Sequence, residues 1–138
     1  MKCAYCSTPA LEGTTIRQSP VKDVVDGISR HAAAGFRHFY FVDNTFNIPP
    51  KYAKALCESI SVARLNVQWR CILYPGFVDE EMAQGMAKAG CVEASLGFES
   101  GSPVVLKNLH KKYKVAEVRS NSNLLKKHGI KRMGFLLL

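Results

Sequence analysis

The chain has 138 residues, 47% of them hydrophobic, and its 19 lysine and arginine residues outnumber 11 acidic residues to give a net charge of +8. This composition indicates a soluble globular protein, because a disordered chain would contain fewer apolar residues for its charge. The apolar run at the C-terminus covers only residues 135–138, whereas a membrane-spanning helix needs roughly 20 residues, so we expect no membrane span.

The N-terminus shows no secretory signal, because Met1 is followed by Lys2 and a polar, cysteine-containing stretch rather than by an apolar segment. The chain has five cysteines, and an odd number without an export signal argues against a disulfide framework. We therefore predict a cytoplasmic protein whose cysteines are free thiols or metal ligands.

The first predicted helix begins at Ser19 and Pro20, which suit an N-cap and the first helical position. Apolar residues then recur at helical spacing over residues 21–32, and Gly35 ends the helix. The aromatic and β-branched residues 36–42 predict the strand that follows.

Three further units repeat this order of helix and strand. The predicted helices begin at Pro49-Pro50, at Asp79 and near Val115, and glycines follow the last two at Gly90 and Gly129. The predicted strands cover residues 67–73, 91–96 and 130–138. Gly97 is predicted to end the strand at 91–96.

Alternating helices and strands at this spacing predict right-handed βαβ units and a parallel sheet, so the fold class is α/β. An open doubly wound sheet and a (β/α) barrel share this pattern, and in both of them functional groups collect at the carboxyl ends of the strands. We expect one domain over residues 1–138, with about four strands and four helices. Because the chain begins with a loop and ends within a strand, we expect this domain to be truncated at both ends.

The net positive charge belongs to one segment. Residues 107–132 contain nine lysine and arginine residues and one acidic residue, whereas acids and bases balance in the rest of the chain. A basic run is more often a solvated helix face than a binding surface, and the aromatic interleaving of single-strand binding platforms does not accompany it. Binding of an anionic partner such as RNA through this segment is therefore an alternative that the sequence does not favour.

Cys3 and Cys6 form a C-x-x-C pair in a polar loop. Such a pair serves as a redox couple, as half of a zinc site or as part of an iron–sulfur site. A redox couple normally opens a helix, and zinc needs two more ligands, so a zinc or thiol redox domain is a less favoured interpretation. The remaining cysteines, Cys57, Cys71 and Cys91, lie on predicted core positions and are expected to be small buried hydrophobic residues.

Residues 1–6, Met-Lys-Cys-Ala-Tyr-Cys, resemble the latter part of the C-x-x-x-C-x-aromatic-C motif of radical S-adenosylmethionine (radical SAM) enzymes. In that motif the first cysteine would lie two residues before Met1. Residues 41–46, 78–81 and 95–101 also resemble radical enzymes that are often fused to a cobalamin-binding domain. The resemblance implies a partial parallel (β/α) barrel of which this chain covers the second to fifth strands.

The resemblance also implies a chemistry. Three thiolates hold three irons of a 4Fe-4S cluster, and the fourth iron is free to bind S-adenosylmethionine. The reduced cluster cleaves this cofactor to a 5′-deoxyadenosyl radical, and the protein positions the cofactor and excludes water. An electron donor such as flavodoxin or ferredoxin is the implied partner, and any cobalamin would bind in a domain outside this chain.

By resemblance, Cys3 and Cys6 are cluster ligands and Tyr5 packs near the adenine. Asp43 and Asn44 are expected to meet the amino group of the methionyl moiety, although an Asx turn at the strand end would explain them equally well. The remaining expected cofactor residues follow or end a later strand and include ribose contacts: Ser95, Glu99 and Ser100. Capping of a following helix by Ser100 or Ser102 is the structural alternative.

The family resemblance thus predicts a radical SAM enzyme, with methylation or another C–H functionalisation as its reaction. With two of the three cluster cysteines, the chain by itself is predicted to be inactive.

Overall fold

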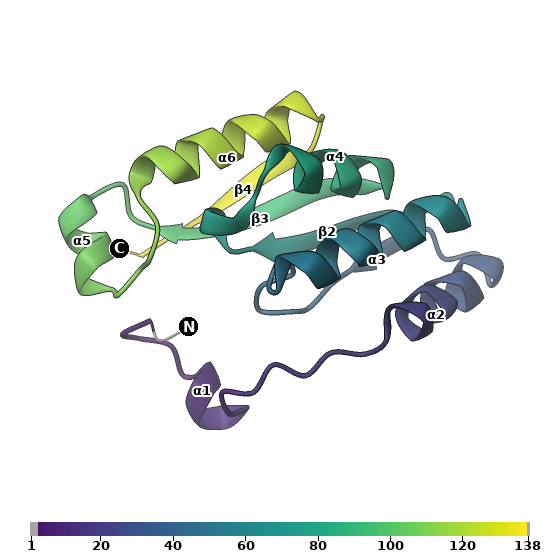
Figure 1. The fold of residues 1–138 in the computed structure, drawn as a ribbon, viewed down its shortest axis with the longest axis horizontal. Helices are drawn as coiled ribbons and strands as arrows, with labels where there is room; N and C mark the ends of the chain where they lie inside the picture. The colour runs from purple at the N-terminus through teal and green to yellow at the C-terminus, as the bar shows by residue number, and fades with distance from the viewer. Residues whose placement is uncertain (1–2, 138) are drawn as a thin grey trace.

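The computed structural model describes residues 3–137 and contains a four-stranded parallel sheet (Figure 1). Its strands are β1 (His38–Tyr40), β2 (Gln68–Leu73), β3 (Cys91–Glu99) and β4 (Lys131–Leu136). They lie in the order β1-β2-β3-β4, and each neighbouring pair is parallel. Because this order never reverses, the sheet has the topology of an open barrel segment rather than of a doubly wound sheet.

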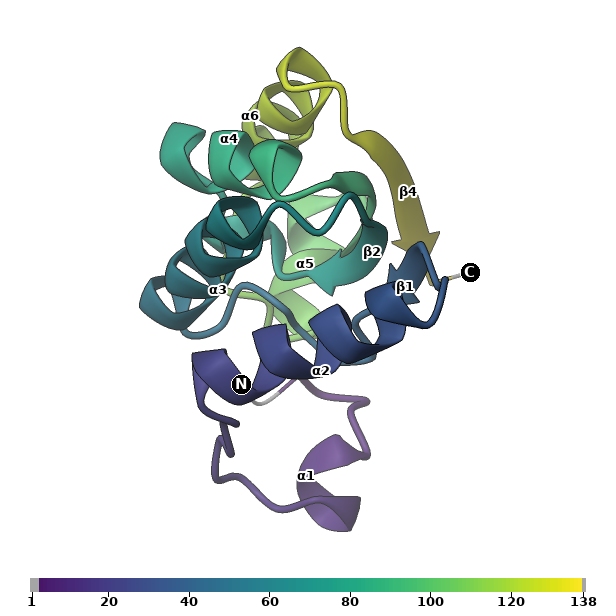
Figure 2. The ribbon, with the colours of Figure 1, turned by 90° about the vertical axis from the view of Figure 1, so that its right-hand side faces the viewer.

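Four helices, one before each strand, form an outer layer on one side of the sheet, as the end view in Figure 2 shows. They are α2 (Val21–Ala33), α3 (Pro50–Ala63), α4 (Glu80–Lys88) and α6 (Val115–Lys127). The prediction of four helix–strand units is therefore confirmed. The cap predicted at Asp79 is also confirmed, since its carboxylate accepts a hydrogen bond from the Met82 amide at 2.8 Å.

The core lies between this helical layer and the sheet. Alternate residues of β2 face the helices, and Trp69, Cys71 and Leu73 are each 1% exposed. The Trp69 ring packs against Phe41 and Phe46, and its indole nitrogen donates to the Ala89 carbonyl at 2.7 Å. The helices therefore pack against one face of the sheet, and the loops that follow the strands lie at their carboxyl ends.

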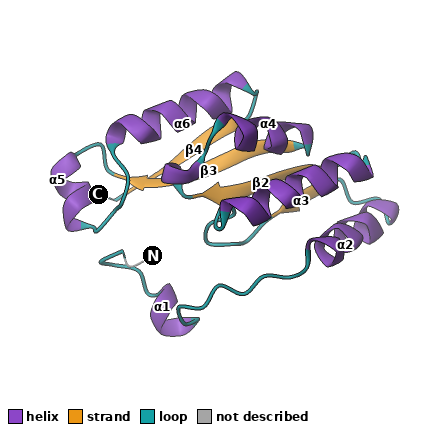
Figure 3. Ribbon diagram, in the orientation of Figure 1, coloured by secondary structure: helices purple, strands orange, loops and turns teal. Residues whose placement is uncertain are grey.

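Three short elements were not predicted from the sequence: α1 (Thr8–Leu11), the 3₁₀ helix η1 (Pro75–Phe77) and α5 (Pro103–Asn108). Figure 3 shows α1 and α5 at the end of the molecule where the N-terminal segment lies. Each is too short to show a helical period in the sequence. The structural alternative of helix capping is observed at Ser102, whose hydroxyl accepts from the Val105 amide at 3.4 Å and caps α5.

Several predicted strand boundaries were wrong. The strand predicted at residues 36–42 is shorter, His38–Tyr40, and the strand predicted at residues 130–138 is Lys131–Leu136, with Leu138 outside the described residues. Gly97 does not end the third strand, which continues to Glu99. Its pairing with β2 ends at Leu96, whereas its pairing with β4 resumes at Glu99 and Leu136 after an irregularity, so β4 keeps the end of β3 in the sheet.

None of the helices within residues 3–137 is both long and apolar enough to cross a bilayer.

Candidate functional site

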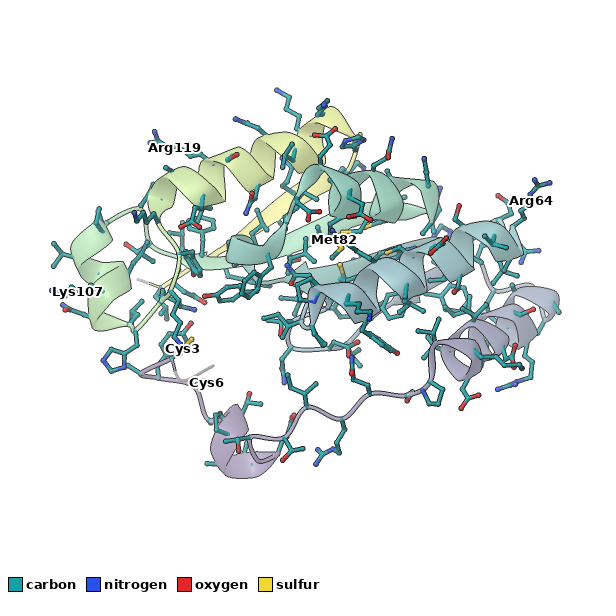
Figure 4. The ribbon with its side chains drawn as sticks, in the orientation of Figure 1. Cys3, Cys6, Arg64, Met82, Lys107 and Arg119 are labelled. Atoms are coloured by element: carbon teal, nitrogen blue, oxygen red, sulfur yellow. The ribbon has the colours of Figure 1, made fainter. Side chains whose placement is uncertain are left out.

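The N-terminal loop lies against α5, near the carboxyl end of β3 (Figure 4). The amide of Ala4 donates to the carbonyl of Leu109, the residue that ends α5, at 3.2 Å. The Cys6 amide donates to the Cys3 carbonyl at 3.2 Å, which closes a tight turn between the two cysteines. Both thiols are free, and Cys3 is half-buried whereas Cys6 is exposed. The turn therefore presents two accessible thiols from one short loop.

Tyr5, between the two cysteines, joins this loop to the sheet. Its hydroxyl donates to Oε1 of Glu99 at 2.5 Å. The ammonium of Lys111 donates to the Tyr5 hydroxyl at 2.9 Å and to Glu99 Oε1 at 3.2 Å. Three residues from distant parts of the chain thus share one hydrogen-bonded cluster, which we call the Tyr5–Glu99–Lys111 triad.

Lys111 and Glu99 of the triad are shielded from water, whereas Tyr5 is 47% exposed. The side chains of Lys111 and Glu99 are only 7% and 13% exposed. Burial by itself would lower the pKa of Lys111, but its hydrogen bond with Tyr5 and its contact with Glu99 outweigh burial and raise that pKa. Burial and the bond to Glu99 raise the pKa of Tyr5. At neutral pH, Lys111 is therefore an ammonium and Tyr5 a neutral phenol, so both donate to the carboxylate.

The backbone at Glu99 adopts φ of 65°, a left-handed conformation that is unusual for a residue with a side chain. Its carbonyl accepts from the Leu137 amide at 3.0 Å, which holds this conformation at the end of β4. Strained backbone of this kind is found most often at functional sites. The conformation turns the chain out of β3 directly before Ser100.

A small apolar cluster packs around Tyr113, close to the segment that carries Lys111 of the triad. Tyr113 is 4% exposed, packs edge-on against Tyr74 with ring centroids 5.2 Å apart, and donates to the Gly97 carbonyl at 2.7 Å. Leu106 of α5 completes this cluster. Because Tyr113 lies two residues after Lys111, its packing fixes the position of the backbone from which the Lys111 side chain extends.

The other predicted cofactor residues are not part of the triad. Asp43 and Asn44 are exposed after β1, and Asn44 donates to a Glu12 carboxylate oxygen at 3.5 Å, so the N-terminal segment also reaches this strand end. Ser95 is 4% exposed within β3, beside Ile72 and Met133. The structure thus brings Tyr5 and Glu99 together and leaves Asp43, Asn44 and Ser95 apart from them.

Ser100 follows Glu99, and its hydroxyl accepts from the Ser102 amide at 3.1 Å. This bond shapes the turn into α5, so Ser100 has a structural role in the cofactor-free chain.

Lys111 and Tyr113 were missed as site residues. Lys111 is one of nine basic residues in its segment, and nothing in the local sequence distinguishes it from its exposed neighbour Lys112. Only the tertiary contact with Glu99 distinguishes Lys111 from Lys112.

Two thiols are the sulfur ligands available at this edge of the sheet. The three other cysteines, Cys57, Cys71 and Cys91, are buried in the core, as predicted. Burial raises the pKa of the Cys57 thiol to about 12. Within residues 3–137, no three histidine, cysteine or acidic side chains lie together in a way that could hold a metal ion.

The basic segment does not form one uninterrupted cationic surface. Lys111 is paired inside the triad, while Lys127 and His128 contact Glu80 of α4 at 2.7 and 2.8 Å. The other basic residues are distributed over α5, the loop after it, α6 and β4. This arrangement gives no support to RNA binding through residues 107–132.

Comparisons with known proteins agree with this geometry. A family model described as the Radical SAM superfamily matches residues 1–138. The bacteriochlorophyllide d C-12(1)-methyltransferase of Chlorobaculum tepidum is 29% identical over 140 residues, which cover 98% of this chain and 30% of that protein. The tryptophan 2-C-methyltransferase of Streptomyces laurentii is 26% identical over 113 residues, covering 76% of this chain and 19% of that protein.

Among solved structures, the radical S-adenosylmethionine methyltransferase TsrM from Kitasatospora setae, with cobalamin and a [4Fe-4S] cluster bound, superposes with a TM-score of 0.92 at 25% identity. The match covers 99% of this chain and 28% of TsrM. The chain thus spans less than a third of the length of these relatives.

Proposed function

Because the chain belongs to the radical SAM superfamily, we propose that it forms part of the core of an enzyme that binds a 4Fe-4S cluster and S-adenosylmethionine. When bound, the cluster supplies the electron that cleaves the sulfonium of this cofactor to a 5′-deoxyadenosyl radical. The observation that carries the proposal is the C-x-x-C turn, held beside the end of β3 by the triad, at the edge where (β/α) folds collect functional groups.

Cys3 and Cys6 are the proposed cluster ligands. Their thiols are soft donors, free of disulfides and accessible, which suits iron–sulfur coordination. Two thiolates fit two of the irons, whereas a cluster with one open iron needs three. We propose that the third thiolate precedes Met1 by two residues, and that residues 1–138 are one incomplete domain of the enzyme.

The proposed cofactor contacts come from the cysteine loop, from β3 and from the end of β1. The Glu99 carboxylate accepts hydrogen bonds from the ribose hydroxyls, and the Tyr5 ring packs on the adenine. Asp43 and Asn44 offer oxygens to the amino group of the methionyl moiety from the end of β1. Ser95 and Ser100, within and after β3, complete the proposed set. The Glu99 side chain is only 13% exposed, which supports its assignment, because hydrogen bonds are strongest where water is excluded.

Methyl transfer is the proposed reaction. The curated relatives named above are methyltransferases, and TsrM was solved with cobalamin bound. A cobalamin-binding domain elsewhere in the enzyme would supply the methyl carrier.

The test measures whether adding the third cysteine increases the amount of iron that the chain binds. A chain extended by Cys-Pro directly before Met1 is expected to retain about four irons after anaerobic reconstitution and desalting, whereas the 138-residue chain retains fewer. Cys3→Ser and Cys6→Ser in the extended chain should lose this iron, and Cys57→Ala, in the core, should keep it. Equal iron in the extended and original chains, or tight zinc without sulfide, would contradict the proposal.

A one-electron carrier such as flavodoxin or ferredoxin is the proposed reductant. The exposed Lys107, Lys112 and Lys114 lie on α5 and just after it, the part of the chain that the cysteine loop contacts through Leu109. Exposed cations beside a redox site steer an acidic partner into a weak complex. The rate of reduction should therefore fall as salt concentration rises, and more steeply than in a Lys107→Ala/Lys112→Ala variant.

A further inference from the structure

Lys111 carries an ion pair unlike the others in residues 3–137. The remaining pairs involve more exposed side chains, such as Lys54 with Asp79 at 26% and 62%, or Lys127 with Glu80 at 64% and 51%. In the Lys111–Glu99 pair, both side chains are at most 13% exposed. Removing two charges from water to this extent is costly, and it is tolerated only where hydrogen bonds satisfy both partners.

The Lys111 ammonium meets that condition by a particular arrangement. It donates to Glu99 Oε1 at 3.2 Å and to the Tyr5 hydroxyl at 2.9 Å, and it also lies 5.2 Å from the centroid of the Tyr5 ring. The Tyr5 hydroxyl in turn donates to the same carboxylate oxygen. Lys111 therefore contacts both the group that ends β3 and the residue between the two cysteines.

The loop has few other attachments to the sheet. The backbone bond from Ala4 to Leu109 joins it to α5, and Lys111 follows Leu109 by two residues. Apart from the direct hydrogen bond from Tyr5 to Glu99, the attachments through Leu109 and Lys111 thus depend on the same short segment between α5 and α6. Tyr113, packed against Tyr74 and bonded to Gly97, anchors this segment to β3.

We propose that Lys111 is a positioning residue that holds the loop of Cys3 and Cys6 against the end of β3 by bridging Tyr5 and Glu99. It does so in the cofactor-free protein, so that the thiols and the Glu99 carboxylate have a defined relation before any ligand arrives. The role of this arrangement in binding a cluster and cofactor rests on the proposed function, whereas the positioning itself does not.

The test uses amide hydrogen exchange of the cofactor-free chain, because exchange at residues 3–7 reports how firmly the loop is held. Lys111→Met keeps the length of the side chain but loses the ammonium, and exchange at Ala4 and Cys6 should rise about tenfold because charge-assisted bonds are lost. Lys111→Arg should restore most of the protection. The matched control is Lys112→Met, an exposed neighbour, which should change nothing.

A second variant guards against general loss of structure. Tyr5→Phe keeps the Lys111–Glu99 pair and removes the hydroxyl that bonds to Glu99 and to Lys111, so it should loosen the loop without affecting exchange in β2 and β3. Combined with Lys111→Met, its effect on the loop should be less than additive, because both changes remove the hydrogen bond between Lys111 and Tyr5.

Unchanged loop exchange in both Lys111→Met and Tyr5→Phe would overturn the inference, as would additive effects in the double variant. Equal loosening by Lys112→Met would do the same. These measurements need no iron, so the inference can hold even if the cluster fails to assemble, and the two proposals can fail separately.

Discussion

The five cysteines occupy two regions that differ in almost every physical respect. Cys57, Cys71 and Cys91 lie between the helical layer and the sheet, where they pack as apolar side chains. Cys3 and Cys6 lie on a loop at the carboxyl end of the sheet, beside a buried ion pair and a strained backbone. The comparison shows that the core thiols serve as apolar packing groups, whereas the two accessible thiols lie on a loop that polar contacts attach to β3 and α5.

The contrast is expected to be largest in thiol reactivity. Cys3 and Cys6 should react with a disulfide reagent in the folded chain, whereas the core thiols should react only after unfolding. With its pKa raised to about 12, roughly one Cys57 thiol in ten thousand is ionised at pH 8, and the thiolate is the reactive form. Counting modified thiols before and after adding denaturant checks this, and five fast-reacting thiols in the native chain would remove the distinction.

The next largest effect concerns the core alone. Trp69→Ala should lower the free energy of unfolding by about 3–5 kcal/mol, because a large buried ring and its bond to Ala89 are lost. Denaturant unfolding measures this change. Below the unfolding transition, the reactivity of Cys3 and Cys6 should stay as in the original chain, which separates the core from the loop.

At the loop, Glu99→Gln should cost about 1–3 kcal/mol, since it leaves the Lys111 ammonium buried without its anionic partner. Glu93→Gln, on the same strand but outside any described ion pair, is the matched control and should cost less. Chemical unfolding of the two variants under identical conditions decides the matter, and equal costs would mean that the triad is not a stabilising contact.

The smallest expected effect lies in the helical layer. Asp79→Ala should cost about 1 kcal/mol through loss of the α4 cap. The hydrogen bond with Lys54 lowers the pKa of Asp79, so the carboxylate stabilises the fold above its unfolded pKa near 3.8, and this contribution is lost as the pH falls through its folded pKa. The difference in stability between the original chain and Asp79→Ala should therefore shrink below pH 4. A difference that is constant between pH 7 and pH 3 would contradict this assignment.

Much of the fold could be predicted because its signals are local. Pro50 at the start of α3 and Asp79 at the start of α4 act on the turn in which they stand, and the apolar period of each long helix lies within one element. The extent of β3 could not be predicted, because a glycine within it ends a strand in one context and continues it in another. Pairing with β4 decides which, and this partner is far away in the sequence.

The candidate site divides in the same way. The spacing of Cys3 and Cys6 marks them as a pair, whereas their role as cluster ligands and the roles of Tyr5 and Glu99 were predicted from the resemblance to radical SAM enzymes. Lys111 could not be identified as a site residue from the sequence, because its segment is rich in lysine and its charge has no partner nearby in the sequence. Its role depends on Glu99, twelve residues earlier, and on Tyr5, at the other end of the chain.

The sequence by itself thus determined the α/β class, the helix–strand units and the identity of the thiols that are open to chemistry, because caps, periods and short motifs act over a few residues. Only the tertiary structure decided that β3 continues past Gly97, and that one lysine among nine basic residues is withdrawn from water to join a loop to a strand. Both depend on which distant segments meet, and desolvation, which makes Lys111 different from Lys112, exists only once they have met.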